Sequence, residues 1–197
     1  MVKDIMTKEE RIELAKKSKD PETLDQLSRD RSSWVRYYVA KNPNTPVETL
    51  TRLSRSKKWQ VRTYVAENPN TPVEILTRLS RDRSYWVRQG VTLNPSTPTE
   101  MLTRLSRDKD NYVRYGVADN PNTSVETLDQ LSRDKEWSVR GRVAENPNTP
   151  VDILDRLSRD KDYTVRENVA DNPKWKAVQK SSLLSVARSA SKWLGIL

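Results

Sequence analysis

Two columns of arginine recur in this sequence at the spacing of a 26-residue phrase, and arginine is the side chain best suited to binding phosphate. A ladder of guanidinium groups could bind alternate phosphates of a nucleic acid strand. Each arginine could instead tie its own turn, by bonding carbonyl groups or the aspartate of a Ser-Arg-Asp triplet. The ladder residues follow the first valine of each copy and are Arg36, Arg62, Arg88, Arg114, Arg140 and Arg166. The second column follows a serine and comprises Arg29, Arg55, Arg81, Arg107, Arg133 and Arg159.

Residue types that carry out catalysis are scarce. The sequence has no histidine and no cysteine, so the commonest general base, the commonest metal ligand and any thiolate are missing. The serine that recurs in each copy, such as Ser54, has no base beside it, and no glycine-rich phosphate loop is present. The sequence therefore predicts a protein that is not an enzyme, with no catalytic residues, no metal and no cofactor.

Two positions after each Val-Arg vary inside an otherwise constant phrase. They hold tyrosine and glycine, whereas other variable positions hold mainly small polar or charged residues. Tyrosine offers a large contact area at low entropic cost, and glycine would leave room for an approaching partner. We expect this stripe to recognise a protein or peptide, although drift on a solvent-exposed face would give similar variation. The stripe consists of Tyr37, Tyr38, Thr63, Tyr64, Gln89, Gly90, Tyr115, Gly116, Gly141, Arg142, Glu167 and Asn168.

An aromatic residue precedes the first valine by one or two places in every copy. Such a column could stack on nucleic acid bases, but packing between repeats is the interpretation that we favour. The column contains Trp34, Trp59, Tyr85, Trp86, Tyr112, Trp137 and Tyr163.

The elements that carry these columns are two short helices per repeat. Asn-Pro-Asn-Thr-Pro opens each copy, and Thr45 is the expected N-cap of the first helix, with Pro46 at its first position and Glu48 closing a capping box. The second helix is expected from Trp59 to Ala66. A fixed period of this length is the signature of a solenoid. We predict an all-α solenoid with a capping helix and degenerate repeat in residues 1–41, five repeats in 42–171 and a basic amphipathic helix in 172–197.

The repeated phrase Val-Arg-x-x-Val-Ala-x-Asn-Pro-Asn-Thr-Pro-x-Glu-Thr-Leu resembles the leucine-rich repeat variant family over about residues 11–173. The resemblance implies a right-handed solenoid of alternating α and 3₁₀ helices. That family's prototype also carries an N-terminal cysteine cluster that binds iron and sulfur. Because this sequence has no cysteine, the resemblance implies no such cofactor here.

The charge of +9 is unevenly distributed along the chain. The full repeats change from basic near residue 42 to acidic near residue 171, and the last 26 residues contain no acid. This gradient predicts weak binding to duplex DNA, so nucleic acid is the second partner class after protein or peptide. The N-terminal residues lack the apolar region of a signal peptide, and no apolar run could span a membrane, so we expect a cytoplasmic protein.

The C-terminal residues 172–197 are expected to form one amphipathic helix. Its apolar stripe could cap the last repeat, dock into a partner groove, or lie on a membrane surface. The residues expected to dock are Trp175, Leu183, Val186, Ala190, Trp193, Leu194 and Leu197.

Overall fold

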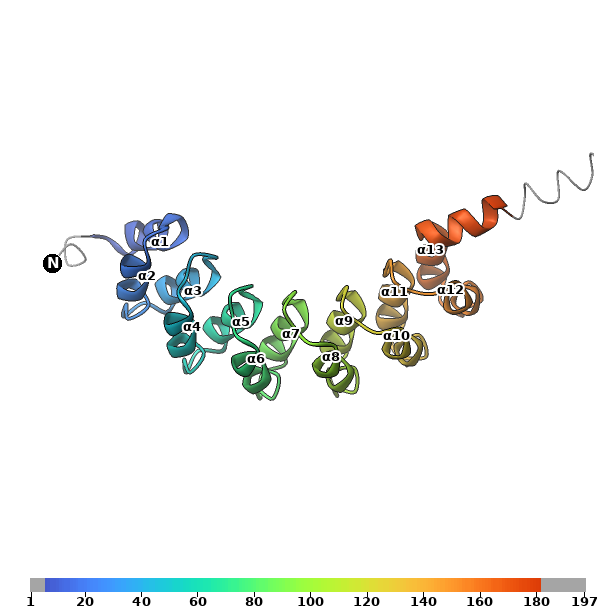
Figure 1. Ribbon diagram of the computed structural model, residues 1–197, viewed down its shortest axis with the longest axis horizontal. Helices are drawn as coiled ribbons and strands as arrows, with labels where there is room; N and C mark the ends of the chain where they lie inside the picture. The colour runs from blue at the N-terminus through green and yellow to red at the C-terminus, as the bar shows by residue number, and fades with distance from the viewer. Residues whose placement is uncertain (1–5, 182–197) are drawn as a thin grey trace, which may run out of the picture. The chain divides into compact units, whose positions relative to one another are not determined.

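The computed structural model describes residues 6–181, and the chain folds into two compact units with bounds Met1–Asn122 and Thr123–Leu197. Both units consist of short helices in pairs (Figure 1). Unit 1 contains α1 (Lys8–Lys17), α2 (Pro21–Leu27), α3 (Ser33–Lys41), α4 (Val47–Leu53), α5 (Trp59–Glu67), α6 (Val73–Leu79), α7 (Tyr85–Leu93), α8 (Thr99–Leu105) and α9 (Asn111–Asp119). Unit 2 contains α10 (Val125–Leu131), α11 (Trp137–Glu145), α12 (Val151–Leu157), α13 (Tyr163–Asp171) and a further helical segment at 173–181.

The helices of unit 1 form two rows (Figure 1). Helices α1, α3, α5, α7 and α9 pack on one another in sequence. Helices α4, α6 and α8 each pack between two helices of that row. A helix of seven to nine residues is not stable alone in water, so each pair depends on its neighbours.

The leucine and valine pairs form the core, as the repeat predicts. Leu50 and Leu53 on α4, and Val61 and Val65 on α5, are buried. Their counterparts in every other repeat are buried as well. The spacing of three or four residues places each pair on one helical face, which is why so lean a composition still forms a continuous core.

The start of the first helix differs from the prediction. A capping box joins Thr7 and Glu10 at the start of α1. In the full repeats, however, Pro46 is the N-cap residue and α4 begins at Val47. The Thr45 hydroxyl instead donates to the carbonyl oxygen of Val39 at 2.5 Å. The expected Thr45 cap is therefore wrong, because Thr45 lies one residue before the N-cap, and its buried hydroxyl donates to the end of the preceding helix while no helix N–H donates to it.

Both helices of each repeat are α-helical, whereas the family resemblance implied one 3₁₀ helix. Hydrogen bonds of the 3₁₀ type lie in the turn after α4, where the N–H groups of Arg55 and Ser56 donate to the carbonyls of Arg52 and Leu53 at 3.2 and 2.9 Å.

The asparagine before the first proline of each copy joins one repeat to the previous one. The Asn68 amide donates to the carbonyls of Ala40 at 2.8 Å and Asn42 at 2.9 Å, and its Oδ1 accepts the N–H of Asn70 at 3.0 Å. A buried polar side chain is tolerated when its donors and acceptors are satisfied in this way. The same pattern occurs at Asn42, Asn94, Asn120 and Asn172.

Candidate functional site

A groove of about 870 Å³ crosses α3, α5 and α7 in unit 1. Its walls are mainly aromatic or apolar, with a few amide, hydroxyl and carboxyl groups between the rings. Binding sites commonly combine an apolar lining with a small number of polar groups in this way. The groove is lined by Trp34, Tyr37, Trp59, Gln60, Thr63, Tyr64, Glu67, Trp86, Gln89 and Leu93.

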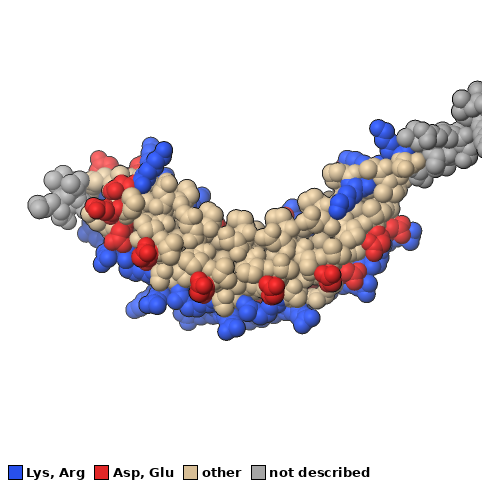
Figure 2. Space-filling model, in the orientation of Figure 1, with Lys and Arg blue, Asp and Glu red and all other residues tan. Residues whose placement is uncertain are grey.

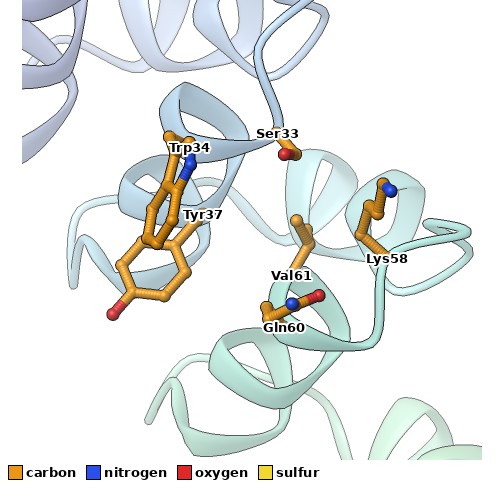
Figure 3. Close-up of a pocket in the computed structure, with 6 residues that line it drawn as sticks. All are labelled: Ser33, Trp34, Tyr37, Lys58, Gln60 and Val61. Atoms are coloured by element: carbon orange, nitrogen blue, oxygen red, sulfur yellow. The ribbon is translucent and has the colours of Figure 1, made fainter.

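A smaller pocket of about 400 Å³ adjoins the groove between α3 and α5. Figure 3 shows the rings of Trp34 and Tyr37 lying together on α3, with Gln60 and Val61 on α5 facing them. Lys58, at the start of α5, completes the far wall with Ser33. Because Trp34, Tyr37 and Gln60 line both hollows, the pocket extends the groove toward the N-terminal ends of these helices.

The tryptophans of the groove remain substantially exposed. Trp34, Trp59 and Trp86 retain 54, 39 and 41% of their accessible surface. Trp59 and Trp86 also stack on each other, with ring centroids 5.9 Å apart and planes inclined by 15°. Packing between repeats therefore explains only part of the aromatic column, because each ring sits in the first turn of its helix, where no preceding turn covers it.

Tyr37 at the groove is un-ionised at neutral pH. The Tyr37 and Tyr64 ring centroids are 4.2 Å apart. Burial, with a smaller contribution from the hydrogen bond to Tyr64, raises the pKa of Tyr37 to about 12. Burial also raises the pKa of the Glu67 carboxyl, partly offset by the charge of Lys41. Burial thus disfavours the charged forms of Tyr37 and Glu67, and a partner without a strong charge suits this part of the surface.

The predicted recognition stripe divides between several environments. Its members Tyr37, Thr63, Tyr64 and Gln89 line the groove. Tyr38 lies elsewhere, with the Lys16 ammonium 4.6 Å from its ring centroid. Three further members behave differently again: Tyr115 is half-buried, Glu167 is exposed and Asn168 donates to the Glu145 carboxylate at 2.6 Å. Arg142, which follows Gly141 in the stripe, has its guanidinium 2.7 Å from the Glu145 carboxylate.

The three glycines of the stripe have a structural reason that the sequence interpretation missed. A Cβ on Gly90 would lie 3.0 Å from the carbonyl oxygen of Thr63, and one on Gly116 would lie 2.0 Å from Oγ1 of Thr92. Gly141 is also buried, against α13. The space beside Gly90 and Gly116 is filled by a neighbouring helix, and Gly141 lies against the side chains of α13, so the expectation that these glycines admit a partner is wrong.

The proposed phosphate ladder is buried at its central positions. Arg62 donates to both carboxylate oxygens of Asp82 at 2.7 and 2.9 Å and to the carbonyl of Ser56 at 2.7 Å. The same clamp joins Arg88 to Asp108 and Arg140 to Asp160. Because these guanidinium groups are occupied, the ladder interpretation is wrong for them, and the alternative that arginine ties its turn is confirmed. The remaining ladder residues, Arg36, Arg114 and Arg166, each bond a carbonyl of the preceding turn.

The clamps also set the ionisation of their carboxylates. Burial alone would raise the pKa of Asp82, but the bonds from Arg62 and from the Ser84 backbone outweigh it and lower this pKa below its usual value. At Asp160 the Arg140 guanidinium has the largest influence and lowers the pKa. These carboxylates therefore stay charged and paired at neutral pH.

Most of the expected docking residues of the tail lie outside the described residues. Only Trp175 falls within them, half-buried in the helical segment 173–181. Within residues 6–181 no cluster of three potential metal-ligating side chains is present. The same residues contain no helix long and apolar enough to cross a membrane.

The stacked helix pairs, the asparagine ladder and the arginine clamps define a helical-repeat solenoid. The sequence model of the leucine-rich repeat variant family matches residues 59–84 and 137–162. A solved leucine-rich repeat variant with a novel repetitive structural motif is 32% identical, with a TM-score of 0.63, over 86% of this chain and 68% of that one. The protein therefore belongs to the leucine-rich repeat variant family.

A second solved structure agrees on the fold. The YibA protein of Escherichia coli is 20% identical, with a TM-score of 0.59, over 83% of this chain and 73% of that one. At that identity the likeness concerns the architecture alone. A search of curated protein sequences gives no match.

Proposed function

We propose that this protein is a non-enzymatic repeat scaffold that binds an extended segment of a partner protein in the groove across α3, α5 and α7. The observation that carries this proposal is the set of half-exposed tryptophans Trp34, Trp59 and Trp86 lining one hollow over three successive repeats. Tryptophan is enriched among the residues that dominate binding energy at protein interfaces.

The lining indicates the chemistry of the segment. Aromatic-lined grooves accept proline or aliphatic side chains of extended peptides, and neutral polar groups fix the peptide backbone. Gln60 and Gln89 supply amides that can both donate to and accept from a peptide backbone. The Tyr37 hydroxyl remains protonated and can donate as well. An apolar segment with few charges fits this set of groups.

Selection from a displayed library of random peptides tests the proposal. Enriched peptides should be apolar. They should lose affinity on the order of several hundredfold when Trp59→Ala and Trp86→Ala are combined, since an aromatic anchor contributes ~2 kcal/mol or more at such sites. The matched control combines Trp137→Ala and Tyr163→Ala, which remove similarly exposed rings from unit 2. Equal loss in both variants, or no enrichment at all, would refute the groove as the binding site.

We propose that the C-terminal helix caps the last repeat and docks a partner only secondarily. Trp175 is half-buried beside that repeat, and Lys176 pairs with Asp171 at 2.8 Å. Removing residues 182–197 should lower the melting temperature. Liposome flotation of the full chain and of the form without residues 182–197 tests the alternative that the tail binds a membrane. That alternative requires that only the full chain floats with the liposomes.

A further inference from the structure

The turn after the first helix carries two exposed basic residues in each of three successive repeats of unit 1. These turn cations are Arg55, Lys57, Arg81, Arg83, Arg107 and Lys109. Figure 2 shows lysine and arginine gathered along the edge below α4, α6 and α8. This edge is separate from the aromatic groove, which lies on the row of second helices.

One recurrent substitution explains why the arginines of this edge are unpaired. In the first repeat Arg29, in the turn after α2, lies 3.3 Å from Asp25, which is four residues earlier and on that helix. The same pair recurs in unit 2, as Arg133 with Asp129 and Arg159 with Asp155. In α4, α6 and α8 a threonine replaces that aspartate, at Thr51, Thr77 and Thr103.

Threonine cannot neutralise the arginine. The hydroxyls of Thr51 and Thr77 donate to backbone carbonyls four residues earlier, both at 2.8 Å. None of the six turn cations makes an ion pair among residues 6–181. The aspartates that follow Arg81 and Arg107 are already held by the buried clamps of Arg62 and Arg88.

We propose that the turn cations form a binding edge for the phosphodiester backbone of a nucleic acid. Packed helices lie ~8–10 Å apart, so two cations per repeat give about one positive charge every 4–5 Å. A nucleic acid strand carries one phosphate per ~3.4 Å of helix axis, which is a similar density. Guanidinium groups also match phosphate oxygens in bidentate geometry.

The surrounding charges favour a strand over a flat anionic surface. Glu48, Glu74 and Glu100 are exposed at the start of the same helices, seven residues before each unpaired arginine. That separation is about 10 Å along a helix. A membrane laid over this face would meet both rows, whereas a strand can follow the basic row alone. A regularly repeated pair of cations matches charges that recur at a fixed spacing along a backbone. An acidic peptide has no such fixed spacing.

The test supplies the missing carboxylates without removing any cation. In the full chain, Thr51→Asp, Thr77→Asp and Thr103→Asp are combined, and the matched control carries asparagine at the same three positions. Fluorescence anisotropy measures binding of a labelled oligonucleotide of about 20 nucleotides, single-stranded in one arm and duplex in the other. The tail is common to all forms, so differences between variants report on the edge.

The wild type and the asparagine control should bind, with affinity falling steeply as salt rises. The aspartate variant should bind at least about tenfold more weakly at ~50 mM salt, and its salt slope on single strands should be shallower by about 2, since three phosphate contacts each contribute about 0.7. Circular dichroism checks that all forms are folded, and the aspartates are native to this position in other repeats. If that variant does not fold, the triple Arg55→Gln, Arg81→Gln, Arg107→Gln variant replaces it.

Three outcomes overturn the proposal. They are equal affinities of the aspartate and asparagine variants, the absence of binding by the wild type at low salt, and equally tight binding of polyglutamate or anionic vesicles. The last result would identify a different class of acidic partner. None of these outcomes bears on the groove, because the variants leave its lining intact.

Discussion

Arg36 has a serine at the position where Arg62 and Arg88 have the aspartates of their clamps. Arg62 bonds Asp82, twenty residues further along, through Nε and Nη2. The position twenty residues after Arg36 is Ser56. Both turns have the same backbone arrangement, because Arg62 bonds the Ser56 carbonyl as Arg88 bonds its equivalent. We therefore expect Ser56→Asp to complete a clamp.

The expected gain follows from the contacts already present. Arg36 is held toward the turn by its bond to the Asp30 carbonyl at 2.5 Å, so little side-chain freedom remains to be lost. Hydrogen bonds to charged groups contribute ~1.5–3 kcal/mol, and desolvation of the new carboxylate opposes most of this. A net stabilisation of about 1 kcal/mol should raise the melting temperature by about 2–4 °C in a protein of this size.

Thermal unfolding followed by circular dichroism tests this prediction at neutral pH and near pH ~2. The clamps lower the folded-state pKa of Asp82 and Asp108. A carboxylate with a lowered pKa stabilises the fold above its unfolded pKa, and that contribution is lost as the pH falls through the folded value. The gain from Ser56→Asp should therefore appear at neutral pH and vanish in acid.

Ser56→Asn is the matched control, because asparagine has the shape of aspartate without its charge. Both residues can accept the N–H of Lys58, as the Ser56 hydroxyl does at 3.3 Å. If Ser56→Asp melts no higher than Ser56→Asn at neutral pH, or keeps its advantage near pH ~2, the reasoning about this clamp is refuted.

Three further predictions concern the contacts between repeats. Asn94→Ala should cost about 2–3 kcal/mol in urea unfolding, because two buried carbonyls and one N–H lose their partner; a cost under ~0.5 kcal/mol would contradict the asparagine ladder. Gly116→Ala should destabilise by ~1–3 kcal/mol, since its Cβ would lie 2.0 Å from the buried Thr92 hydroxyl. Gly141→Ala should be neutral or stabilise by up to ~1 kcal/mol in the same assay, because its Cβ would meet only the amide end of a side chain at 3.1 Å and alanine favours the helix. If Gly141→Ala destabilises the protein more than Gly116→Ala does, the packing argument for these glycines is refuted. The free energy of unfolding should also fall as the pH drops through the lowered folded-state pKa of Asp108. In urea unfolding across acidic pH, Asp108→Asn should lose less of this free energy than the wild type does.

The repeat and its core could be predicted because their signals are local. Leu50 and Leu53 lie three residues apart, and Val61 and Val65 lie four apart, so each pair occupies one face of a helix whatever surrounds it. The N-cap prediction failed at Thr45 because its hydroxyl donates to the carbonyl of Val39 instead of accepting an N–H of α4. This bond depends on where the end of α3 lies, which is a matter of tertiary packing.

The candidate site was predicted only in part. Tyr37 and Tyr64 were expected on a recognition stripe, and both line the groove. The tryptophans beside them were expected to be packing residues, yet 39% of Trp59 is exposed. Exposure depends on how far the neighbouring repeat covers the first turn of a helix, and no pattern within one repeat contains that information.

The sequence alone determined the 26-residue unit, its two helices and the apolar pairs that stack it, since these follow from spacing within about two helical turns. Only the tertiary structure decided the roles of the two arginine columns, which are equally constant in sequence. Arg62 meets a carboxylate twenty residues away and is buried, whereas Arg55 faces solvent without a partner. The physical reason is that charge pairing depends on which side chains the stacking of one repeat on the next brings within hydrogen-bond distance.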